Sequence, residues 1–305
     1  MRKYILGMSL LLLCNMSWAE VSDLTSALQG TYRACVGIDD DLAGMKKLAG
    51  INTAITGVGT GLGVGATAVG IAKAKTDKKT EKWQAVLDDL IERHAMNIKH
   101  ERIVNDDVDA FFKEYQFNSV ADVKRSINEA EEKSKKLGNW RTGLLASSTA
   151  TNIAGALIAN KNRVDDDLKA KIDDCVAAVH VLKNAINQAQ VAGEDVSEAQ
   201  DIYTACREYE YLDLSPIDKK ARSAMFASTV GAVAGGVGTA TSVMANTEKT
   251  REGDKKTEKN LNTAANVMAV GSTIASAGAT VFNAAQISAI KKVATVSEKC
   301  TGLLQ

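Results

Sequence analysis

Four long stretches of this chain contain no charged residue, and they constrain the fold more than any other feature. They cover residues 48–72, 142–160, 223–247 and 260–290, and each is long enough for a helix that crosses a bilayer. Their many glycine, alanine, serine and threonine residues make insertion into a membrane energetically marginal. Each glycine destabilises a helix by about 1 kcal/mol relative to alanine, so we expect close packing against another helix to offset that loss.

The chain repeats its own organisation, and we predict two copies of one helical unit. The hexapeptide Asp-Lys-Lys-Thr-Glu-Lys occurs at 77–82 and again at 254–259, each time between two charge-free stretches. A register without gaps also aligns Gly-Val-Gly at 63–65 with Gly-Val-Gly at 236–238. Such self-similarity is typical of a repeated structural unit. The predicted boundaries are 20–195 for the first repeat and 196–305 for the second.

The first residues have the composition of a secretory signal peptide. Arg2 and Lys3 precede an apolar segment at 5–13, and Ser-Trp-Ala at 17–19 provides a cleavage site. We therefore expect residues 1–19 to be removed and the mature protein to reach the periplasm, the outer membrane or the outside of the cell. Removal takes away two of the 37 basic residues and none of the 37 acidic ones, so charge gives no reason to expect nucleic acid as a partner.

Four cysteines remain after this removal, and an even number in an exported chain favours disulfide bonds. The duplication favours a bond within each copy, which pairs Cys35 with Cys175 and Cys206 with Cys300. Each bond would then join the start of one copy to its end. The main alternative joins Cys175 to Cys206 across the linker and Cys35 to Cys300 between the terminal helices.

The composition predicts an all-α fold. A single proline, Pro216, and the scarcity of turn clusters argue against a sandwich or barrel of short strands. Residues 84–136 and 164–190 carry apolar side chains at spacings of three and four, which is typical of amphipathic helices. We predict internally duplicated long helical hairpins with packing faces rich in glycine and alanine, clamped by disulfides.

The first copy carries an amphipathic insertion at about 83–139 that the second copy lacks. Three of the five phenylalanines lie in this insertion. One interpretation is a helical extension covered by its own small apolar face. The other makes Phe111, Phe112 and Tyr115 an exposed aromatic group that binds a partner protein.

Glycines within the charge-free stretches recur at a helical spacing. Gly57, Gly61 and Gly65 are four residues apart, with Gly59 and Gly63 interleaved between them. Residues four apart share one face of a helix, and a face without side chains lets a second helix approach closely. We expect Gly61 to lie at the centre of such a packing face. The same packing role is predicted for Gly155, Gly231, Gly235 and Gly278.

This small-xxx-small spacing resembles the glycine-zipper segments of bacterial envelope and membrane-active proteins. The resemblance covers the charge-free stretches alone and identifies no single family. It implies close helix pairing, often in or against lipid. The other interpretation is a soluble antiparallel hairpin with the polar hexapeptide at its tip.

No motif in the sequence indicates catalysis, and we expect no enzyme, no cofactor and no metal. Residues 63–68 fit a loose dinucleotide-binding pattern, but no predicted strand precedes them. His94 and His100 are six residues apart, which does not place both on one helical face. We expect a non-catalytic envelope protein that acts as a structural or adaptor module through a protein partner or self-association. The alternative is a membrane-active or pore-forming protein that inserts its glycine-rich hairpins.

Overall fold

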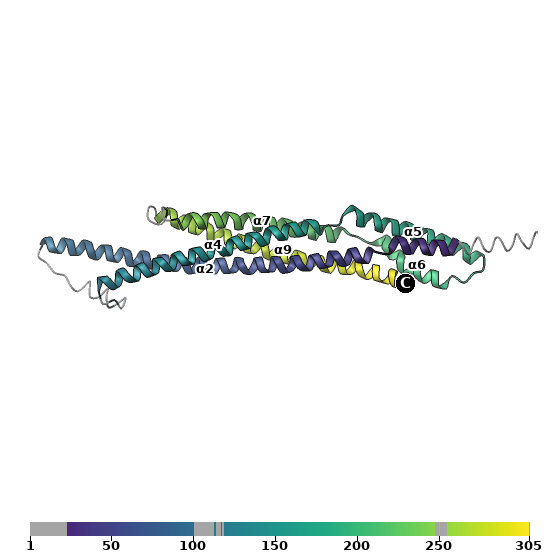
Figure 1. Cartoon of the computed structure of the whole chain (residues 1–305), viewed down its shortest axis with the longest axis horizontal. Coiled ribbons are helices and arrows are strands. Elements are labelled where there is room, and N and C mark those ends of the chain that lie inside the picture. Colours follow the sequence, from purple (N-terminus) through teal and green to yellow (C-terminus); the bar gives the residue numbers. More distant parts are fainter. Residues whose placement is uncertain are drawn as a thin grey trace, which may run out of the picture. The chain divides into compact units, whose positions relative to one another are not determined.

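The computed structural model describes residues 23–100, 113, 117, 119–247, 250 and 255–304, without the side chains of residues 90 and 93–100. Within these residues the fold is all-helical and contains no strand, as the composition predicts. The helices are 23–35, α2 (Ile38–His100), α4 (Val120–Lys161), α5 (Asp166–Val191), α6 (Ser197–Cys206), the 3-10 helix η1 (Arg207–Tyr211), α7 (Ser215–Ala245) and α9 (Lys255–Leu304) (Figure 1).

The chain divides into two compact units, and each unit takes segments from both predicted repeats. Unit 1 contains the described parts of Met1–Ala54, Gly155–Phe226 and Ala279–Gln305, whereas unit 2 contains Ile55–Ala154 and Ala227–Gly278. The boundary predicted between residues 195 and 196 lies inside unit 1. A long helix packs against whichever helices lie beside it at each level, so compact units need not follow the order of the chain.

Unit 1 has a conventional apolar core. Its largest fully buried side chains include Ile38, Leu42, Leu182, Ile217 and Ile290. Two glycines make turns that a residue with a side chain would strain, because each has a positive φ: 92° at Gly37, before α2, and 81° at Gly193, after α5.

The start of α5 is capped by Asp165, whose side chain accepts a hydrogen bond of 2.8 Å from the backbone nitrogen of Leu168. In η1 the buried Tyr209 donates a hydrogen bond of 2.6 Å to Ser297. Burial raises the pKa of the Tyr209 phenol to about 12. The phenol therefore remains a neutral donor at physiological pH.

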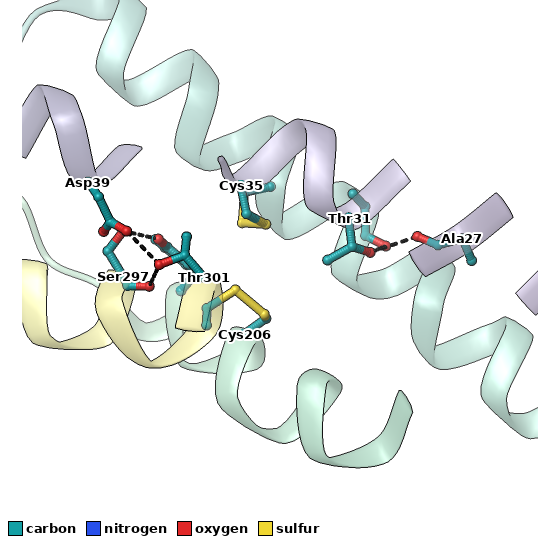
Figure 2. The surroundings of a disulfide bond; sticks show 11 residues. Ala27, Thr31, Cys35, Asp39, Cys206, Ser297 and Thr301 are labelled. Carbon is teal, nitrogen blue, oxygen red and sulfur yellow. Dashed lines mark hydrogen bonds between the residues drawn. A yellow bond between two sulfur atoms is a disulfide. The ribbon is translucent and has the colours of Figure 1, made fainter. Parts of the chain in front are cut away.

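Two disulfides close unit 1. Cys35 is bonded to Cys175 and Cys206 to Cys300, which is the pairing that the predicted duplication favours. All four cysteines are completely buried. Figure 2 shows both bonds, together with Thr31, whose hydroxyl donates to the carbonyl of Ala27 one turn earlier.

Neighbouring helices in unit 2 run antiparallel. Gly59 of α2 lies against Thr151 of α4, and Asp77 of α2 accepts a hydrogen bond from Ser134 of α4, so numbers rise along one helix as they fall along the other. Three further helix pairs are antiparallel by the same criterion. Arg141–Ser242 and Asn152–Gly231 join α4 to α7, and Gly238–Met268 and Ala227–Gly278 join α7 to α9. Thr273–Gly63 and Asn266–Gly70 join α9 to α2. Unit 2 is therefore an up-down-up-down bundle of α2, α4, α7 and α9 (Figure 1).

Each helix of unit 2 buries one face at alternating spacings of three and four residues. On α4 the buried positions from 134 to 152 are Ser134, Gly138, Arg141, Leu145, Ser148 and Asn152, and on α7 those from 228 to 242 are Ser228, Gly231, Gly235, Gly238 and Ser242. This alternation has an average period of 3.5, the repeat of a left-handed coiled coil. Glycine, serine and asparagine occupy positions that a soluble coiled coil fills with leucine and valine.

The described ends of the insertion form a small apolar cluster within unit 2. Leu87 of α2 and Val123 and Ile127 of α4 are buried together, and the rings of Trp83 and Phe117 meet edge to face at 5.4 Å. This agrees with the interpretation of a helical extension with its own apolar face. The alternative site at Phe111, Phe112 and Tyr115 lies outside the described residues, as does the signal peptide at 1–19.

Candidate functional site

The interior of unit 2 leaves no room for side chains at several glycines. A Cβ atom added at Gly59 would lie 2.6 Å from the hydroxyl oxygen of Thr151. One added at Gly63 would overlap the side chain of Thr273 and lie 3.2 Å from its Cα atom. Because that second contact involves backbone, the opposing helix would have to move to accept it.

The predicted face of Gly57, Gly61 and Gly65 is wrong for its first two members. Nothing lies within 4 Å of a Cβ atom at Gly57 or at Gly61, and at Gly65 it would make only an ordinary contact of 3.5 Å with Leu144. Steps of four residues turn about 40° around a helix of 3.6 residues per turn, so such a ladder drifts off a face that alternates between steps of three and four. The buried glycines are the interleaved Gly59 and Gly63.

The remaining predicted packing glycines differ in how closely they are approached. A Cβ atom at Gly231 would lie 2.8 Å from the Asn152 amide nitrogen, and one at Gly235 would lie 2.5 Å from the Thr149 hydroxyl. Gly155 is buried. At Gly278 the added atom would make only an ordinary contact, 3.9 Å from the Cβ atom of Ala227.

Substitutions at Gly61 and Gly63 form a matched pair, because they should change the free energy of unfolding in opposite directions. Gly61→Ala should raise the free energy of unfolding by about 0.5 to 1 kcal/mol, because alanine favours the helix and the space is open. Gly63→Ala should lower it by about 1 to 3 kcal/mol, because Thr273 must shift. Urea unfolding followed by circular dichroism measures both variants. Equal changes at the two positions would contradict the placement of the packing face.

Hydroxyl groups in the interior bond to the neighbouring helices. Ser148 donates to the carbonyl of Gly59 at 3.1 Å, and Ser272 donates to the carbonyl of Gly231 at 3.0 Å. Ser276 donates to the side-chain oxygen of Asn152 at 2.9 Å. The interior of unit 2 is therefore polar as well as small, and these hydroxyl groups bond between helices. The hydroxyl of the buried Ser228 has no hydrogen-bond partner among the described residues.

A fully buried arginine lies at one end of this interior. Arg141 is 0% exposed. Its Nε donates to Ser242 at 3.1 Å, its Nη1 to Asn266 at 3.1 Å and its Nη2 to Asn262 at 2.6 Å. One side chain thus connects α4 with α7 and α9.

A second buried cation lies beside it. Lys73 is 1% exposed, and its Nζ lies 2.7 Å from a carboxylate oxygen of Asp77 and 3.2 Å from one of Glu258. An open pocket of about 690 Å³ borders both carboxylates. We call Lys73, Asp77, Arg141 and Glu258 the ion cluster. Its carboxylates reach solvent, whereas its two cations lie inside the bundle.

The sequence did not single out these two cations, although it carried a signal for them. Lys73 directly follows the stretch 48–72, and Arg141 directly precedes the stretch 142–160. A charge at the edge of a charge-free stretch marks a change of environment along the helix. What the sequence cannot show is that both charges turn inward.

Within the charge-free stretches of unit 2, exposed apolar side chains lie on all four helices. The large ones are Val58, Val64 and Ile71 of α2, Ile153 of α4, Val230, Val233, Val237, Val243 and Met244 of α7, and Val267, Val270 and Ile274 of α9. Outside these stretches, Ile91, Val120 and Trp140 of unit 2 are also exposed. By length and composition, three helical segments could cross a membrane, within Asp23–Asp89, Ser215–Ala245 and Lys255–Leu304. In its charge-free part, unit 2 therefore buries many polar groups between its helices and exposes apolar groups, the opposite of the usual pattern in a soluble bundle.

Among the described residues, no group of three or more His, Cys, Asp and Glu side chains is arranged to hold a metal ion. Comparison with models of protein families, with curated proteins and with solved structures gave no match. The fold defines the class of this chain: an all-helical protein with a disulfide-closed apolar unit and a second unit of reversed polarity.

Proposed function

We propose that this chain is an exported, non-catalytic envelope protein that binds a lipid bilayer through unit 2. The observation that carries the proposal is the reversed polarity of unit 2, with valine and isoleucine outside and serine, asparagine and glycine inside. Exposed apolar groups of this number are unfavourable in water. Contact with lipid would remove them from water, while the interior hydrogen bonds would hold the helices together without a hydrophobic driving force.

Unit 1 supports an additional role as a structural or adaptor module. Its apolar core resembles that of a soluble domain, and its two buried disulfides are typical of an oxidising compartment such as the periplasm. We propose that unit 1, apart from the ends of the charge-free stretches that it contains, stays in water at the periplasmic or outer-membrane surface and binds a protein partner or a second copy of the chain.

A second candidate function is permeabilisation of the membrane. The polar interior of unit 2 favours it, because Asn152, Ser272, Ser276 and Arg141 would face a path between the helices if these moved apart. We rank it below simple membrane binding, since these side chains bond to one another or to the neighbouring helices.

We also propose that the protein arose by duplication of a helical hairpin with glycine-rich faces. The repeated hexapeptide and the two disulfides, each closing one copy, support this history. The close approaches at Gly59 and Gly63 in one copy, and at Gly231 and Gly235 in the other, support a shared use of glycine for helix packing.

Flotation with vesicles of phosphatidylcholine and phosphatidylglycerol tests the proposed function. The full chain should float with the vesicles, and the double variant Val233→Asp/Ile274→Asp should reduce the floating fraction at least tenfold, because each aspartate opposes burial in hydrocarbon by about 3 kcal/mol. The matched control is Val181→Asp/Val191→Asp, which changes two exposed apolar residues of unit 1 and should float normally.

A chain that remains monodisperse and free of lipid without detergent would contradict the membrane function and favour the adaptor role alone. Release of a dye trapped inside the same vesicles would favour permeabilisation over simple binding. Circular dichroism of both double variants checks that the helices are retained.

A further inference from the structure

We infer that the charge-free stretches of α2, α4, α7 and α9 cross the bilayer together, with Trp140 at one lipid–water interface and the ion cluster beside it. This inference rests on the proposed function, since a chain that does not bind lipid cannot span it. It goes further because an apolar surface can also lie flat on a membrane. Four observations favour crossing.

The first observation is length. The shortest charge-free stretch, 142–160 on α4, has 19 residues between Arg141 and Lys161. At 1.5 Å per residue it is about 28 Å long, close to the roughly 30 Å of hydrocarbon in a bilayer. The other three stretches are longer and lie in the three helical segments that are apolar enough to cross a membrane. The stretch of α4 is long enough but less apolar, so it would cross as a member of the bundle.

The second observation is that the stretches lie at the same level in unit 2. Two layers of contacts each take one residue from every helix. One layer contains Gly70, Arg141, Ser242 and Asn266, and the other contains Gly59, Asn152, Gly231 and Ser276. The charge-free segments are therefore side by side and could enter one apolar slab as a unit.

The third observation is the distribution of apolar side chains around the bundle. A helix that lies on a membrane surface has an apolar side and a charged side. Each helix of unit 2 instead turns apolar side chains outward, represented by Val64, Ile153, Val233 and Ile274. The stretches also carry no charge on any side, so they lack the charged face of a helix that lies on a membrane surface.

The fourth observation is the chemistry where the stretch of α4 ends. Trp140 is 70% exposed and directly precedes Arg141, whose side chain turns inward. Tryptophan is enriched at membrane interfaces, and charged groups within membrane bundles face the interior or a water-filled space. Asp77 and Glu258 pair with the buried Lys73 beside an open pocket, which suits a position at the edge of the hydrocarbon.

Tryptophan quenching by brominated lipids measures these depths. In the full chain, Trp18→Phe/Trp83→Phe leaves Trp140 as the single tryptophan. A second variant adds Trp140→Phe and Ile153→Trp, which moves the tryptophan 13 residues along α4 to another exposed position, about 20 Å away. A third variant carries its single tryptophan in unit 1, through Val181→Trp instead of Ile153→Trp. The fluorescence of this tryptophan should not be quenched.

Crossing predicts that Trp140 is quenched most by bromine near the headgroups and that the tryptophan at position 153 is quenched most by bromine deep in the chains. The ratio of deep to shallow quenching should differ at least twofold between the two positions. Equal ratios, with the protein still floating with the vesicles, would overturn the crossing and leave the proposed membrane binding intact. No quenching and no flotation would overturn both.

Discussion

Replacing Cys206 and Cys300 by alanine should lower the free energy of unfolding by about 4 to 5 kcal/mol, because the bond closes a long loop in the unfolded chain. The two cysteines are separated by 94 positions in the sequence, and both are completely buried. The bond ties the end of α6 to the last turns of α9, close to Ser297 and Thr301 (Figure 2). Urea unfolding without reductant, followed by circular dichroism, measures the change.

The other disulfide provides the comparison. Cys35→Ala/Cys175→Ala opens a bond with a separation of 140, so its effect should be of similar size and slightly larger in the chain-entropy model. In a variant that lacks Cys35, Cys175, Cys206 and Cys300, the free energy of unfolding should not depend on reductant. If the full chain unfolded at the same urea concentration with and without reductant, the expected stabilisation would be contradicted. Peptide mapping without reductant tests the pairing, which a main species linking Cys175 to Cys206 would contradict.

Arg141→Ala should lower the free energy of unfolding by about 3 to 5 kcal/mol. The change removes a fully buried side chain and leaves the oxygens of Ser242, Asn262 and Asn266 without the donor that they share. An unsatisfied buried polar group is unfavourable by about 1 to 3 kcal/mol, and the vacated volume adds to the loss. Chemical unfolding in the medium in which the protein is monodisperse measures this value.

Arg163→Ala is the matched control for this experiment. Arg163 is partly exposed and pairs with Asp218 of unit 1 at 3.1 Å. Exposed ion pairs contribute about 0 to 1 kcal/mol, so this variant should remain close to the wild type. If Arg141→Ala were equally mild, the buried network would not hold α4 to α7 and α9.

The repeated glycines show why the packing face could not be predicted from spacing. The aligned segments 63–65 and 236–238 have the same sequence, yet Gly63 is buried in the first and Gly238 in the second, while Gly65 and Gly236 are half-buried. The buried faces are therefore displaced by one residue relative to the sequence alignment. A stretch in which small residues lie on every side does not specify which side a partner covers.

The sequence by itself determined the helical class, the charge-free stretches and the favoured disulfide pairing, because proline content, helical periodicity and cysteine spacing are local or countable properties. Only the tertiary structure decided that Gly59 and Gly63 are buried instead of Gly57 and Gly61, and that Lys73 and Arg141 turn inward. The physical reason is that burial belongs to a pair of surfaces. A glycine fits equally well against a helix, lipid or water. Its burial is decided by the neighbouring helix at the same level, which supplies Thr273 as the contact of Gly63 and Asn266 as the contact of Gly70.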